Sequence, residues 1–122
     1  MTERLSCNSC SKPMRLTLEG KKATCECGQI AGIDDRGEGY MTILPRLYPC
    51  RMTDPKMLRE FGEYQASEHR FFNQLRYCLN LIDEAELSAR SANTDAALAR
   101  FIKDNVLPLE AKHSWWRFWE RA

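Results

Sequence analysis

The side chains best suited to chemistry in this chain are four cysteines near its N-terminus. They form two close pairs, Cys7 with Cys10 and Cys25 with Cys27, separated by the segment 11–24. Zn²⁺ prefers four soft ligands in a tetrahedron, and two thiolates from each of two tight turns supply that set. The residues in and after the pairs are small or polar, as such turns require: Asn8, Ser9, Ser11 and Gly28. The spacing therefore predicts one zinc ion held by these four cysteines.

Other interpretations of the cysteines exist. The four thiols could be small buried residues or form disulfides, and Cys50 could replace Cys25 or Cys27, since only Glu26 separates that pair. For Cys50, which follows Pro49, we favour packing at a junction. The first residues lack the apolar run of a signal peptide, so we expect a reducing, cytoplasmic compartment. Paired cysteines in such a compartment more often hold metal than form disulfides, and we therefore favour zinc.

Four thiolates leave a zinc ion without an open position for water, which makes the predicted site structural. The rest of the sequence offers no catalytic arrangement. His69 and His113 are the only histidines, and neither lies in a recognisable nucleophile motif. The segment 37–39 lacks the strand–turn–helix context of a phosphate-binding glycine loop. We therefore expect a protein without enzymatic activity.

The residues around the cysteines read as short strands. Apolar and polar side chains alternate over 14–19, a turn is expected at Gly20 and Lys21, and strands are expected over 22–25 and 29–33. Segment 40–44 could add a further strand. Together with Gly28 and the two cysteine pairs, this segment resembles a zinc ribbon, over the N-terminal part of the chain only. The resemblance implies two cysteine turns joined by a small antiparallel sheet. It also implies a regulator, inhibitor or accessory subunit, as small ribbon proteins often are.

Helices are expected in the second half of the chain. Thr53 and Asp54 are good N-caps, and Pro55 suits a first helical turn. Apolar residues then recur at steps of three and four, which predicts one long helix from 54 to about 90 and a second helix near 95–106 packed antiparallel on it. The residues expected to be buried are Phe61, Phe72, Leu75, Leu79, Ile82, Leu98, Phe101 and Ile102.

These elements predict an α+β fold. We expect a zinc ribbon with a short sheet over residues 1–45, a proline-containing linker over 46–53 and a helical region over 54–122. The last of these would comprise a helical hairpin with a long first helix, followed by an aromatic C-terminal helix or tail. A chain of 122 residues that is 43% hydrophobic can form a real core. No stretch has the length of a membrane-spanning helix, so we expect no membrane association.

The C-terminal end carries an unusual load of aromatic side chains: Trp115, Trp116, Phe118 and Trp119, with Arg117 among them. On a helix these rings spread over more than half of the circumference. They could cover the long helix and close the core, or at least one could anchor a partner or a second copy of the chain. A membrane-surface role ranks lower, because the stretch is short and weakly charged. The candidate partner-binding residues are Trp115, Trp116, Arg117 and Trp119.

Two functions are consistent with these features. We favour a non-enzymatic zinc-binding module that binds a larger protein and regulates or inhibits it, in a nucleic-acid machine as the resemblance implies. The alternative is a ribbon that binds RNA or DNA through its basic residues: Arg4, Lys12, Arg15, Lys21 and Lys22. The net charge of +1 gives no global signal for nucleic acid. The ribbon also has no aromatic residue before Gly39 on which a base could stack, which favours a protein partner.

Overall fold

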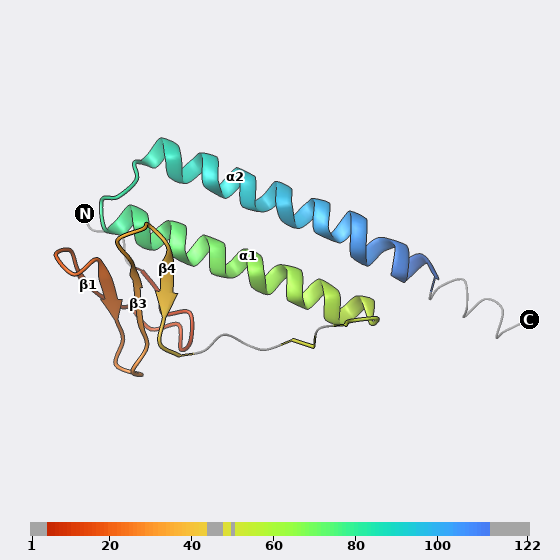
Figure 1. Cartoon of the computed structure of the whole chain (residues 1–122), viewed down its shortest axis with the longest axis horizontal. Helices are drawn as coiled ribbons and strands as arrows, with labels where there is room; N and C mark the ends of the chain where they lie inside the picture. Colours follow the sequence, from red (N-terminus) through yellow and green to blue (C-terminus); the bar gives the residue numbers. More distant parts are fainter. Residues whose placement is uncertain (1–4, 44–47, 50, 113–122) are drawn as a thin grey trace, which may run out of the picture.

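The computed structural model describes residues 5–43, 48–49 and 51–112 of the chain. A small sheet lies beside one end of a helical hairpin (Figure 1). The strands are β1 (Arg15–Thr17), β2 (Lys22–Thr24), β3 (Ile30–Ile33) and β4 (Gly39–Met41). The helices are α1 (Pro55–Cys78), α2 (Glu84–Phe101) and one π-helical turn, η1 (Ile102–Val106), after which helix continues to 112. The predicted α+β class is confirmed.

The sheet is antiparallel throughout, with its strands in chain order. Its register aligns Leu16, Ala23, Ala31 and Met41 across the four strands, so that these side chains share one face. Ala23 and Ala31 are fully buried, which identifies this as the inner face. The expected strands are confirmed with shorter bounds, and the suggested strand after residue 39 is present as β4.

The inner face packs against the C-terminal half of α1. A single core cluster contains side chains from both parts: Leu5, Cys7, Met14, Ala23, Ala31, Ile33, Phe71, Leu75 and Leu79. At Gly39 the contact is so close that a Cβ atom would lie 2.7 Å from Cε1 of Phe72. Arg76 adds a polar link by donating to the carbonyl of Gly37 at 3.1 Å. The proposed domain boundaries stay a prediction, but the sheet and helix α1 share one core.

Helix α1 begins as predicted and ends earlier. The Asp54 side chain accepts from the backbone N–H of Lys56, and Pro55 occupies the first turn. The expected continuation to about residue 90 is wrong, because Asn80 adopts the left-handed conformation (φ 62°) that commonly follows a helix end. Asp83 then caps α2 by accepting from the N–H of Glu86. The expected break at 91–94 therefore lies inside α2.

Helix α2 lies antiparallel to α1 (Figure 1). An ion pair between Arg70 and Asp95 (2.7 Å) joins the two helices, and Arg59 pairs with Glu110 farther along. Gly62 allows close approach, since a Cβ atom there would lie 2.6 Å from Cδ1 of Phe101. No residue of α2 itself is buried.

The expected core is only partly correct. Leu75 and Leu79 are buried, whereas the other six expected residues are half-buried: Phe61, Phe72, Ile82, Leu98, Phe101 and Ile102. The physical reason is that two helices cover only one stripe of each other, and no third layer covers α2 within the described residues. None of the described helices is both long enough and apolar enough to cross a membrane.

Leu75 offers the test of the shared core. Leu75→Ala should lower the free energy of unfolding by about 2–5 kcal/mol, because the side chain is 0% exposed between sheet and helix. Leu81→Ala is the matched control, since Leu81 is 41% exposed, and it should change stability by less than about 0.5 kcal/mol. Urea denaturation measures both. Equal effects of the two changes would show that the sheet does not pack on α1.

Candidate metal centre

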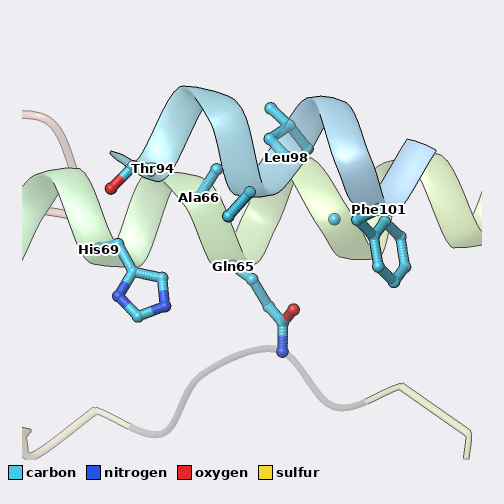
Figure 2. Close-up of a pocket in the computed structure, with 8 residues that line it drawn as sticks. Gln65, Ala66, His69, Thr94, Leu98 and Phe101 are labelled. Atoms are coloured by element: carbon cyan, nitrogen blue, oxygen red, sulfur yellow. The ribbon is translucent and has the colours of Figure 1, made fainter. Parts of the chain in front are cut away.

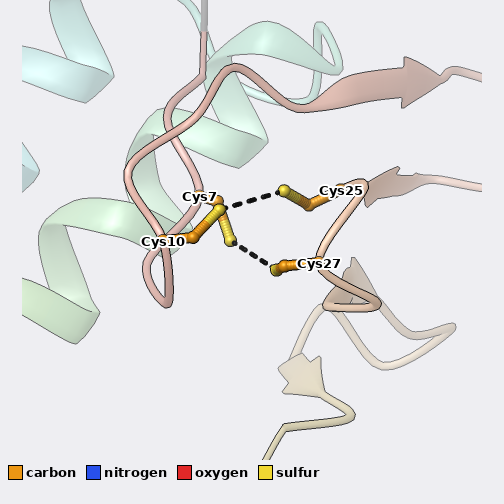
Figure 3. Close-up of side chains that lie close together, drawn as sticks. All are labelled: Cys7, Cys10, Cys25 and Cys27. Carbon is orange, nitrogen blue, oxygen red and sulfur yellow. Dashed lines mark hydrogen bonds between the residues drawn. The ribbon is translucent and has the colours of Figure 1, made fainter.

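The four N-terminal thiols meet at one end of the sheet (Figure 3). All four sulfur atoms lie within 4.8 Å of one another. Cys10 and Cys25 are 3.3 Å apart, and Cys7 and Cys27 are 3.7 Å apart. Four thiolates bound to one zinc ion at about 2.3 Å would be roughly 3.8 Å apart, the edge of the tetrahedron. A disulfide needs about 2.05 Å, so the arrangement fits a metal ion and contains no disulfide.

The first cysteine pair sits on a turn closed by backbone hydrogen bonds. Cys7 donates to the carbonyl of Lys12 (2.8 Å), and Ser11 donates to the carbonyl of Cys7 (2.9 Å). Ser11 has a φ of 67°, which turns the chain back toward β1. The N–H of Ser9 points at the sulfur of Cys7, 3.4 Å away. This contact holds the Cys7 sulfur in place within the turn.

The second pair uses a tighter turn with a single residue, Glu26, between the cysteines. Cys25 donates to the carbonyl of Gln29 (2.9 Å), and Gly28 donates to the carbonyl of Cys25 (3.0 Å). Gly28 has a φ of 98°, a conformation that other residues rarely adopt. This glycine allows a short turn to direct both sulfur atoms to the same side. The short spacing is therefore compatible with a four-thiol cluster.

The local environment shifts the pKa values of Cys10 and Cys25 in opposite directions. The backbone N–H of Lys12, followed by the Cys25 thiol, lowers the pKa of Cys10 to about 7. At Cys25, the N–H of Cys27 favours the thiolate, but burial and the neighbouring thiols outweigh it. They raise the pKa of Cys25 to about 12. A bound divalent cation would stabilise the thiolate of Cys25 against this effect.

A buried glutamine links the two cysteine turns to the residues that follow β4. Gln29 is 1% exposed, and its Nε2 donates to Oδ1 of Asn8 in the first turn (3.1 Å). Its Oε1 accepts from the Thr42 hydroxyl (3.2 Å) and from the N–H of Ile43 (2.8 Å). Gln29 thus holds the relative position of the two turns and anchors the end of β4.

The burial of the four cysteines and the chemistry of their sulfur atoms indicate which ion the centre would bind. Cys7 is buried, Cys10 and Cys25 are half-buried, and Cys27 is exposed at the surface. Four thiolates are soft donors, a set that suits zinc among the common divalent ions. Because the protein supplies all four positions, a bound zinc ion would have none left for a reacting water.

The other predicted site residues are placed as follows. Lys12 pairs with Glu26 across the two turns (3.9 Å), Lys21 lies in the turn after β1, and Arg15 and Lys22 lie on the outer face of the sheet. The remaining candidates lie outside the described residues: Arg4, Cys50, His113, Trp115, Trp116, Arg117 and Trp119. Sequence reasoning missed Gln29, whose polar side chain at a strand start gives no sign of burial.

A hollow also lies between α1 and α2 (Figure 2). Its polar lining includes Gln65, His69 and Thr94, and Figure 2 shows His69 and Gln65 projecting away from α2. The Thr94 hydroxyl is already used, since it donates to the carbonyl of Arg90 (3.0 Å). No nucleophile and base meet among these lining residues, so the hollow suggests no reaction. The absence of enzymatic activity stays a prediction.

Comparison with known protein families, with curated proteins and with solved structures gives no match to this chain.

Gln29 should be needed for tight metal binding although it is not a ligand. Gln29→Leu leaves Asn8, Thr42 and the N–H of Ile43 without their partner, so zinc affinity should fall by about 10- to 100-fold. Competition with a chromophoric chelator measures this affinity. Gln65→Leu, at an exposed position on α1, is the matched control and should bind zinc normally. An unchanged zinc affinity in Gln29→Leu would show that Gln29 does not support the metal site.

Proposed function

We propose that this chain is a non-enzymatic module that binds one structural zinc ion through Cys7, Cys10, Cys25 and Cys27. The observation that carries the proposal is the cluster of four sulfur atoms, all within 4.8 Å. Two separate turns deliver these atoms, and backbone N–H groups point at the sulfurs of Cys7, Cys10 and Cys25. This convergence is the arrangement that a four-thiolate zinc site requires.

The size of the sheet supports a structural role for the metal. Its strands are three or four residues long, at the short end of the usual range, so the sheet has few hydrogen bonds of its own. In small zinc-binding units the free energy of metal binding is also free energy of folding. Cys7 belongs both to the thiol cluster and to the core shared with α1. The metal therefore stabilises the packing of the sheet on the helix.

We further propose that the module binds a larger protein, which it regulates or inhibits. The support comes from the end of the hairpin farthest from the sheet. Met57 at the start of α1 and Leu107 after η1 are 37% and 48% exposed there. The chain then continues toward the aromatic segment, whose tryptophans and arginine are the residue types that dominate protein interfaces. The regulatory role follows from the ribbon resemblance.

Metal content is the direct test of the zinc proposal. The purified protein should carry about one zinc ion per chain, and Cys10→Ser should lose it and unfold the sheet. Cys78→Ser is the matched control, because Cys78 lies on α1 outside the cluster, and it should keep its zinc. Elemental analysis and circular dichroism provide the readouts. Metal-free protein with free thiols and an intact fold would contradict the proposal.

The aromatic segment tests the protein-partner proposal. Trp116→Ala and Trp119→Ala should weaken capture of a partner from the source cells, or self-association in sedimentation, with little change in melting temperature. Core tryptophans behave differently, since their truncation costs about 3–5 kcal/mol of stability. A large loss of stability with unchanged association would assign the segment to the core instead.

A further inference from the structure

The outer face of the sheet is a surface that the metal centre and the hairpin leave unused. The inner face is fixed by Ala23 and Ala31, so the residues that alternate with them point outward. The register places Thr17, Lys22, Gly32 and Tyr40 in one row across the four strands, with Arg15, Thr24 and Ile30 in the next row. We call these seven residues the outer sheet face.

Tyr40 forms an aromatic platform on this face. Its ring lies over Gly32, since a Cβ atom at position 32 would lie 2.5 Å from Cζ and 2.8 Å from Cε1 of Tyr40. Only a glycine allows the ring to lie this close to the backbone. Tyr40 is nevertheless 41% exposed, and its hydroxyl has no hydrogen-bond partner among the described residues. One side of the ring is therefore covered by the sheet and the other is open to solvent.

Positive charge lies beside this platform. Lys22 is the direct cross-strand neighbour of Gly32, and Arg15 lies in the adjacent row on β1. Neither forms an ion pair with any residue in the described part of the chain, and none of the seven residues of the outer sheet face carries a carboxylate. Asp34 and Glu38 lie beyond Tyr40 at the β3–β4 turn, where the Asp34 carboxylate caps the turn. The face is thus basic on the β1–β2 side of the ring.

We propose that the outer sheet face binds single-stranded nucleic acid, with a base stacked on Tyr40 and phosphates at Lys22 and Arg15. Strands two apart in a sheet are separated by about 10 Å, so the ring and the cations contact different parts of an extended strand. An open aromatic face beside unpaired cations is what single-strand binding uses. A duplex hides its base faces, and this surface presents no helix to enter a groove.

A protein partner fits this surface less well. A typical protein interface has an apolar centre surrounded by a polar rim, whereas the outer sheet face has one isoleucine and one aromatic ring among threonines and cations. The proposal is independent of the partner proposed for the C-terminal segment. It requires only a folded, zinc-loaded sheet.

The test uses the full zinc-loaded chain and fluorescein-labelled oligonucleotides of mixed sequence, as single-stranded DNA, single-stranded RNA and duplex DNA. Fluorescence anisotropy should show binding to a single strand in preference to the duplex. Tyr40→Leu, which still covers Gly32 but cannot stack, should bind roughly tenfold more weakly. Tyr40→Phe should bind almost normally. Lys22→Ala and Arg15→Ala should each reduce the slope of log affinity against log salt by about 0.7.

Matched controls separate this surface from general charge effects. Arg100→Ala and Lys103→Ala remove the same charge from exposed positions on the hairpin, and they should leave affinity and salt slope unchanged. Melting temperature and zinc content report folding of each variant. If Tyr40→Leu does not fold, ultraviolet cross-linking of the wild-type complex decides, and the proposal requires the cross-link at Tyr40.

Three results would overturn the proposal. The first is absence of binding to any oligonucleotide by folded, zinc-loaded protein. The second is equal affinity for duplex and single strand with no effect of Tyr40→Leu, which indicates a non-specific polyelectrolyte interaction. The third is a cross-link elsewhere in the chain. None of them affects the zinc proposal, because metal content is measured on the same samples.

Discussion

Bringing four sulfur atoms together at one end of a very small sheet is the constraint on which the rest of this structure depends. Strands β1 to β4 are only three or four residues long, so each contributes few backbone hydrogen bonds to the register. The cysteine turns precede β1 and follow β2, so a metal joining them fixes the ends of both strands. Once the register is fixed, small residues lie on one face, and α1 can approach that face closely. A metal bound at the thiol cluster would therefore stabilise the sheet and the core that the sheet shares with α1.

The two faces of the sheet follow from this register. Ala23 and Ala31 bring the inner face close enough for Phe71 and Leu75 to complete a core. On the opposite face, Gly32 leaves space that the ring of Tyr40 fills. The same alternation thus produces both the packing that stabilises the molecule and the surface that we propose binds nucleic acid. The hairpin contributes differently: its inter-helix ion pairs at Asp95 and Glu110 are exposed, and such pairs contribute little stability.

Local signals in the sequence were enough for some features. The cysteine spacing predicted the thiol cluster, and Asp54 with Pro55 predicted the start of α1, because ligand turns and helix caps are encoded within a few residues. The end of α1 was misplaced because apolar residues continue at helical spacing through Leu79, which stays buried after the helix has ended. The hydrophobic pattern therefore continues beyond the end of the helix, whereas Asn80 and Asp83 mark where α1 ends and α2 begins.

The role of Gln29 and the position of Tyr40 depend on strand register, which relates residues far apart in the sequence. The sequence comparison of partners considered only the segment before Gly39, and β4 adds Tyr40 to the same sheet just beyond it.

X-ray absorption spectroscopy at the zinc edge, on protein purified without added chelator, tests the central claim most directly. It counts the atoms bound to the metal and measures their distances. The structure predicts four sulfur neighbours at about 2.3 Å and no nitrogen or oxygen neighbour. Three or fewer sulfurs, completed by lighter atoms, would show that the centre is open or that a cysteine of the cluster is not a ligand. That result would contradict the closed, structural zinc site from which this account of the fold begins.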